Sequence, residues 1–128
     1  MAGIWKERPE AHDYPAAVDY LTLLMEEKAA KKLVNQLRKA PTIHKKAKDL
    51  LRASRLTVLP RDNPHVAGDF KKIKNGKALS PVLLVRGDVT RDLPPVVADG
   101  YHRICAVWHW DEEAPICCCL VDLPKGRS

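Results

Sequence analysis

The residues best suited to chemistry stand together in one short run, Asp99-Gly100-Tyr101-His102-Arg103. A short apolar segment typical of a strand precedes this run, and a helical pattern follows it. A strand that turns directly into a helix leaves the first backbone N–H groups of that helix unpaired, with the positive end of the helix dipole behind them. The run therefore predicts a turn that binds an anion.

Three residue types in this turn suit a phosphate ligand. Gly100 lets the backbone approach a ligand closely, His102 can donate a hydrogen bond, and Arg103 offers a bidentate fork to phosphate oxygens. Asp-Gly is also a common turn, and an exposed His-Arg pair is often only solvated, so the spacing alone leaves both interpretations open. The order of the surrounding elements adds information that the spacing lacks.

The second half of the chain predicts a sequence of strands and helices around this turn. In order, the predicted elements are a strand at 56–59, a helix opened by Asn63-Pro64, strands at 82–86 and 96–98, a helix after Gly100 and a strand at 116–121. A polar loop at 87–95 joins the second and third strands. This order predicts an α+β fold with a small mixed sheet.

The first half reads as helical. A helix begins near Pro15, but its apolar stripe is displaced beyond Lys28, so this helix either is buried on two faces or breaks near Ala29. Pro41 ends the pattern, and Thr42 is positioned to cap a second helix. In that second helix Ile43, Ala47, Leu50 and Leu51 form one face, and Lys45, Lys48 and Arg52 stand opposite.

The net charge of +6 is concentrated in the helical half. Residues 28–55 carry ten lysines and arginines against the single acid Asp49, a local charge of +9. This concentration favours an anionic partner, of which nucleic acid is the commonest, with Lys45, Lys48 and Arg52 as candidate contacts. The alternative is that these charges only solvate helix faces.

Bulk properties limit the class of protein. A chain of 128 residues fits one domain, and 45% hydrophobic with 30% charged residues argues against long disorder. The sequence begins without a basic and apolar leader and has no apolar run of about 18 residues, so we expect a cytoplasmic protein without a membrane anchor. Cys117, Cys118 and Cys119 are consecutive in a predicted strand and alternate between its faces, which favours free thiols and no metal.

The ordered motifs of residues 55–122 resemble those of the ParB/sulfiredoxin-like superfamily. The residues that carry the resemblance are the predicted strand Leu56 to Leu59, then Asn63-Pro64-His65, Pro81-Val82-Leu83-Leu84-Val85, Val96-Val97-Ala98 with the following five-residue turn, Ile104-Cys105-Ala106, and Ala114-Pro115-Ile116. The resemblance implies a ParB/sulfiredoxin-like domain at 55–123, preceded by an N-terminal arm and basic helical extension at 1–54 and followed by a tail at 124–128.

The resemblance also implies a ligand. Members of the superfamily bind nucleotides at this turn: some use ATP or ADP as kinases or sulfinic acid reductases, and others bind CTP as clamps on DNA. ATP, ADP or CTP, with or without Mg²⁺, is therefore the expected ligand. Gly100, Tyr101, His102 and Arg103 form the phosphate-facing turn, and His65 is a second contributor. Asp99 and His102 are the candidate catalytic residues, with a purely turn-forming role as the alternative for Asp99, and hydrolysis, phosphotransfer and simple binding all stay open.

Two departures from the family pattern narrow the expected activity. Sulfiredoxins place a nucleophilic cysteine directly before the His-Arg pair, where this chain has Tyr101, which argues against sulfinic acid reduction. No DNA-reading segment follows the last predicted strand, which argues against site-specific partition clamping. A non-enzymatic nucleic-acid-binding or regulatory module is the rival prediction. A third is a protein-binding domain with Trp108 and Trp110 as anchors.

Overall fold

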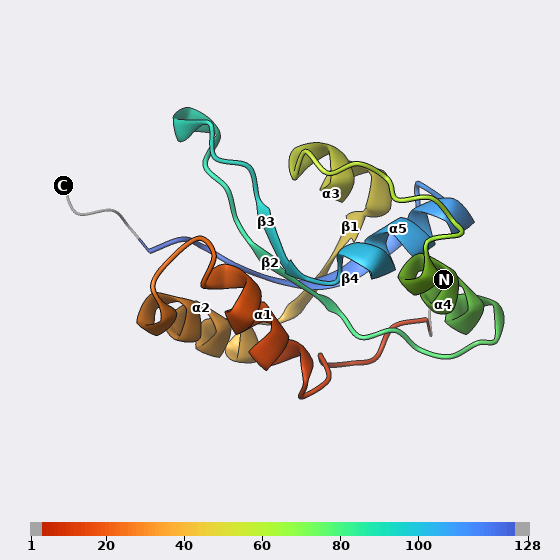
Figure 1. The fold of residues 1–128 in the computed structure, drawn as a ribbon, viewed down its shortest axis with the longest axis horizontal. Helices are drawn as coiled ribbons and strands as arrows, with labels where there is room; N and C mark the ends of the chain where they lie inside the picture. The colour runs from red at the N-terminus through yellow and green to blue at the C-terminus, as the bar shows by residue number, and fades with distance from the viewer. Residues whose placement is uncertain (1–3, 125–128) are drawn as a thin grey trace.

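The structure is a computed structural model that describes residues 4–124, and within them it has five α-helices and one four-stranded sheet (Figure 1). The helices are α1 (Asp13–Leu21), α2 (Glu27–Lys39), α3 (Ala47–Ala53), α4 (Pro64–Lys74) and α5 (Tyr101–Trp110). The strands are β1 (Thr42–Lys46), β2 (Val82–Val85), β3 (Val96–Asp99) and β4 (Pro115–Val121), and a short 3-10 turn, η1 (Val89–Arg91), lies between β2 and β3. The predicted α+β class is confirmed.

The sheet is mixed and has the strand order β1-β4-β2-β3. β4 pairs antiparallel with β1 and parallel with β2, and β2 pairs antiparallel with β3. All four residues of β2 are buried, as expected of a strand that is covered on both faces. The predicted strands around 82–86, 96–98 and 116–121 are therefore confirmed.

Helices cover both faces of the sheet, and the alternation of side chains along each strand assigns every strand residue to one side (Figure 1). Val82 and Leu84 face a core shared with α3, α4 and α5, whereas Leu83 and Val85 face a second core shared with α1 and α2. Cys118 belongs to the first core, Cys119 to the second, and all four cysteines are free thiols.

The helical first half contributes directly to this sheet. α1 ends at Leu21 and α2 begins at Glu27. The helix is therefore interrupted at residues 22–26, slightly before the expected position at Ala29. The two displaced apolar stripes belong to two separate helices that pack on the same face of the sheet. β1 adds an edge strand, so residues 1–54 and 55–123 share one sheet.

The helix predicted from Thr42 is wrong, because 42–46 forms the edge strand β1 and α3 begins only at Ala47. Thr42 pairs with Cys119 and Ile43 with Cys118, so this segment forms a β-strand that pairs with the free edge of β4. β-branched residues such as threonine and isoleucine suit a strand, and pairing with β4 outweighs the local helical spacing.

The strand predicted at 56–59 is also wrong. This segment has no regular secondary structure and lies outside the sheet. The Tyr101 hydroxyl donates to the carbonyl of Thr57, and His109 Nε2 lies 2.8 Å from the carbonyl oxygen of Leu59. Side chains of α5 therefore supply the hydrogen bonds that a neighbouring strand would have supplied.

The N-terminal arm is tied to the body of the protein. Trp5 forms an isolated parallel bridge with Leu79, and the Lys6 amide donates to the Leu79 carbonyl over 2.8 Å.

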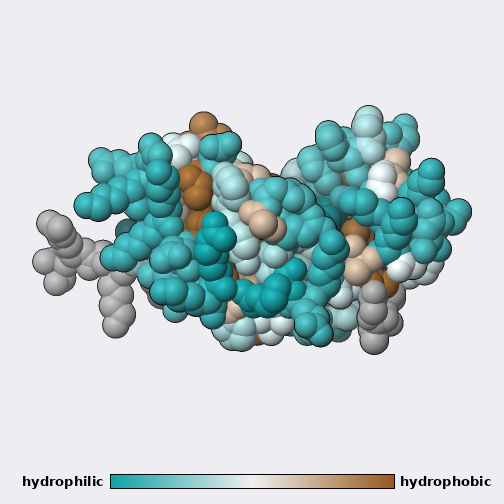
Figure 2. Space-filling view, turned by 90° about the horizontal axis from the view of Figure 1, so that it is seen from below, coloured by the Kyte–Doolittle hydropathy of each residue, from teal (hydrophilic) through white to brown (hydrophobic). Residues whose placement is uncertain are grey.

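Most of the tail expected at 124–128 lies outside the described residues. Seen from below, the surface is mainly hydrophilic with small apolar areas (Figure 2), and the exposed apolar side chains include Leu23 and Leu24 between α1 and α2. Among residues 4–124, no helix has both the length and the apolar composition that crossing a membrane requires.

Candidate functional site

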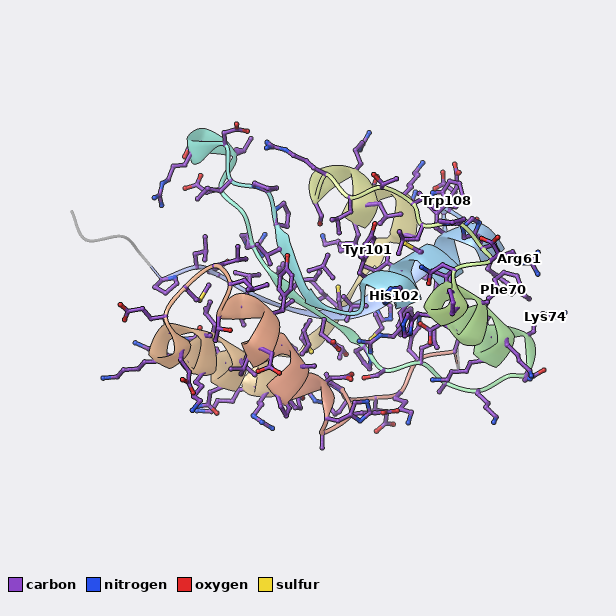
Figure 3. All side chains as sticks on the ribbon, in the orientation of Figure 1. Arg61, Phe70, Lys74, Tyr101, His102 and Trp108 are labelled. Atoms are coloured by element: carbon purple, nitrogen blue, oxygen red, sulfur yellow. The ribbon has the colours of Figure 1, made fainter. Side chains whose placement is uncertain are left out.

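Two helix N-termini meet at the Gly100 turn. α4 begins after Asn63, whose side-chain oxygen accepts hydrogen bonds from the amides of His65 (3.0 Å) and Val66 (3.2 Å). α5 begins after Gly100, and within residues 4–124 no side chain caps its N-terminus. The rings of His65 and His102, each in the first turn of its helix, lie with their centroids 4.7 Å apart. Figure 3 labels Tyr101 and His102 at the start of α5, next to α4.

Gly100 is required by the shape of the turn. Its φ of +112° lies in the region that L side chains rarely adopt. A Cβ at this position would stand 2.7 Å from Cγ2 of Val82, closer than side chains pack. The glycine therefore lets β3 pass into α5 directly above β2. Because glycine has no side chain, it cannot cap the first-turn amides of α5.

Arg103 lies elsewhere than the sequence suggests. Its guanidinium points into the molecule, where Nη1 donates to the Ser80 carbonyl (2.7 Å) and to Asp13 Oδ2 (3.1 Å), and Nη2 donates to Asp99. The side chain is only 13% exposed. The guanidinium that the sequence assigns to phosphate is thus engaged by internal acceptors, because the buried Asp13 and the partly buried Asp99 need a counter-charge.

The same network explains Asp99, the expected catalytic acid. Burial raises the pKa of the Asp99 carboxyl above its ordinary value, the adjacent Arg103 opposes this shift, and the nearby Asp13 adds to it. The Ser80 hydroxyl donates to Asp13 and accepts from the amide of Glu10 at 3.0 Å. Asp99 therefore fixes the turn through Arg103, and the network joins α1, β3 and α5.

The two histidines have an electrostatic setting of their own. Burial lowers the pKa of His102, the neighbouring His65 lowers it further, and Asp69 acts in the opposite direction. Asp69 lies one turn after His65 on α4, and burial raises the pKa of its carboxyl. At pH 7 His102 is consequently a neutral imidazole, with one nitrogen that donates and one that accepts.

A cleft of about 410 Å³ adjoins the turn. Ala16 and Tyr20 of α1 form one wall, and Ser54 and Leu56 form another. The remaining lining comes from 94–98 and from the turn itself. The walls are largely apolar, but the buried Ser54 hydroxyl has no hydrogen-bond partner within residues 4–124. The cleft thus places an apolar space beside an uncapped helix terminus.

Comparison of the chain with models of protein families, with curated proteins and with solved structures found no match.

The basic residues selected as nucleic-acid contacts do not share one helix face. Lys45 lies on β1, whereas Lys48 and Arg52 lie on α3. Lys48 forms an ion pair with Glu113, and Arg52 lies 3.3 Å from Asp49. Two of the three candidates therefore have acidic partners on the protein's own surface.

Metal and thiol chemistry find little support in the described part of the chain. Residues 4–124 contain no group of three or more His, Cys, Asp or Glu side chains placed to hold a metal ion. Burial raises the pKa of Cys118 to about 12, and it also raises the pKa of Cys105. These thiols stay protonated at neutral pH and are poor nucleophiles.

Sequence reasoning missed four residues of the site. Asp69 follows His65 by four positions on a predicted helix, so the helical repeat was a usable signal for it. Asp13, Ser54 and Ser80 come from distant segments, and no local pattern marks them. Their roles follow from contacts that only the folded chain creates.

Proposed function

We propose that this protein is a ParB/sulfiredoxin-like domain that binds the phosphate groups of a nucleotide at the Gly100 turn. The observation that carries the proposal is the meeting of two helix N-termini, with His65 and His102 4.7 Å apart beside an uncapped first turn. Neighbouring helix N-termini favour a negatively charged ligand, because both dipoles present their positive ends there and the first-turn amides of α5 lack a side-chain cap.

The residues divide the work in a specific way. The first-turn amides of α5 donate to phosphate oxygens, and His102 and His65 add side-chain donors at the same place. Gly100 permits the close approach of the backbone. Arg103 acts at one remove, since it holds Asp99 and thereby the end of β3 from which the turn starts.

The adjoining cleft suits the nucleoside part of such a ligand. Leu56 and Val97 offer apolar contacts to a base. ATP, ADP and CTP remain the nucleotides that the resemblance implies, with Mg²⁺ as a companion of the phosphates. His102, neutral at pH 7, is the group placed to accept a proton if the phosphate is hydrolysed or transferred.

A thermal-shift panel of ATP, ADP, CTP and GTP, with and without Mg²⁺, tests the proposal, because a ligand that binds only the folded state raises the melting temperature. We expect at least one nucleotide to do so. In isothermal titration, the double variant His65→Ala/His102→Ala should bind that nucleotide at least about tenfold more weakly, since charge-assisted hydrogen bonds contribute about 1.5–3 kcal/mol each. His44→Ala, on the exposed edge strand β1, is the matched control.

Two results would contradict the proposal. One is a panel in which no nucleotide shifts the melting temperature of the unchanged protein. The other is a His65→Ala/His102→Ala variant that is folded and binds as tightly as the His44→Ala control.

A further inference from the structure

A second hollow, of about 340 Å³, lies on the side of α4 toward its C-terminal end. It is lined by Arg61, Ala67, Phe70, Lys71, Lys74 and Asn75. Residues 67, 70, 71 and 74 follow the spacing that places helical side chains on one face. Figure 3 shows Arg61, Phe70 and Lys74 at one end of the molecule, whereas Tyr101 and His102 lie near its centre. The hollow is therefore separate from the Gly100 turn.

One aromatic side chain, Phe70, lines this hollow, and a second, Trp110, packs against Phe70. The guanidinium carbon of Arg61 lies 4.0 Å from the centre of the Phe70 ring, a cation–π contact. On α5, the ring of Trp110 lies 5.7 Å from that of Phe70. Trp110 is 46% exposed, so a large aromatic surface is open to a partner beside the cations.

Within residues 4–124, the basic side chains that line the hollow form no ion pairs with acidic residues of the protein. Across residues 4–124, no carboxylate lies within 4.0 Å of the charged groups of Arg61, Lys71 or Lys74, although many other basic side chains of the protein have acidic partners, such as Lys46 with Glu113. Asp69, the acid of α4, is 17% exposed and lies beside the histidines of the Gly100 turn. Asp69, with its ion-pair partner Lys72, thus lies toward the Gly100 turn, whereas Lys71 and Lys74 line the hollow.

We propose that this hollow and Trp110 form a binding surface for single-stranded nucleic acid. Arg61, Lys71 and Lys74 would contact successive phosphates, and an unpaired base would stack on Trp110. Lysines at the end of a helix also stabilise its dipole, but that effect explains neither Arg61, which lies before α4, nor the exposed tryptophan. A single strand fits better than a duplex, because stacking on a side chain requires a base whose face is free.

Fluorescence anisotropy with a labelled single-stranded oligonucleotide tests the proposal in the full-length chain. Three phosphate contacts predict a slope of about −2 for log K against log salt, or roughly a fifteenfold loss of affinity between about 50 and 200 mM salt. Lys71→Glu/Lys74→Glu should weaken binding at least about tenfold. Lys28→Glu/Lys32→Glu on α2 changes the net charge equally and should retain most of the affinity, so it is the matched control.

Trp110→Ala tests the stacking contact, and we expect it to weaken single-strand binding about tenfold while leaving weak duplex binding unchanged. In the unchanged protein, an unlabelled oligonucleotide should quench tryptophan fluorescence, which keeps the test decisive if a variant fails to fold. Absence of binding at about 100 mM salt would overturn the proposal, as would equal losses in the α4 and α2 variants. Binding that is indifferent to Trp110→Ala, with no quenching, would overturn the assignment to a single strand.

Discussion

Arg103→Met is expected to destabilise the protein strongly, because the guanidinium of Arg103 is the counter-charge of two carboxylates. Methionine keeps much of the length of the apolar stem but removes the charge and all its donors. Asp13 and Asp99 then lose their cationic partner, and the Ser80 carbonyl loses its donor. The substitution thus isolates the electrostatic role of the side chain.

The magnitude follows from burial. Arg103 is 13% exposed and the side chain of Asp13 is 7% exposed, so water cannot take over these contacts. Removing one partner of a buried ion pair costs about 3–5 kcal/mol, because it leaves an uncompensated buried charge. The ion pair between Arg86 and Asp122 provides a control, since Arg86 is 61% exposed. Arg86→Met should cost less than about 1 kcal/mol.

The loss should also depend on pH. Arg103 opposes the rise in the pKa of Asp99 that burial causes, so the variant should have a still higher Asp99 pKa in the folded state. A raised carboxyl pKa means that the folded state binds more protons than the unfolded state, so its stability falls as pH rises through that pKa. The deficit of Arg103→Met relative to the parent should therefore be smaller at pH 5 than at pH 8.

Urea denaturation followed by circular dichroism at pH 5, 7 and 8 measures these free energies of unfolding. The double variant Arg103→Met/Asp99→Asn should recover part of the loss, because it removes one of the two unpaired charges. A deficit no greater than that of Arg86→Met would refute the reasoning, and so would a deficit that is the same at all three pH values. If Arg103 instead served mainly to bind phosphate, its loss would weaken nucleotide binding with little effect on stability.

Three further predictions concern the same elements. Gly100→Ala should lower stability by about 1–3 kcal/mol in thermal denaturation, because the φ of +112° and the Val82 side chain of β2 both exclude a Cβ. Gly68→Ala, in open space within α4, should instead add about 0.5–1 kcal/mol of stability. In an NMR titration His102 should show a pKa below that of a free histidine, and His65→Ala should raise it; a value at or above the free one would contradict the burial argument. Cys118, with a pKa of about 12, should resist alkylation at pH 8 until the protein is denatured, and rapid labelling of the native protein would show that the thiol is accessible.

The sequence by itself determined the elements whose signals are local. Asn63 caps α4, Pro64 suits its first turn, and the spacing of its apolar residues already indicates the buried face. The turn at Gly100 was equally readable, because a glycine between a strand and a helix is a requirement of the backbone at that position. Such features depend on residues within one or two turns of each other.

Only the tertiary structure decided the remaining features. Residues 42–46 fit a helical pattern, but the edge of β4 takes them into the sheet, whereas 56–59 fit a strand and find hydrogen bonds from α5 instead. The sequence predicted Arg103 as a phosphate ligand, whereas in the structure its guanidinium donates to Asp13, which lies 90 residues earlier in the chain. A local pattern indicates which secondary structures a segment is able to form. Its actual hydrogen bonds and ion pairs depend on groups from distant parts of the chain that the fold brings next to it.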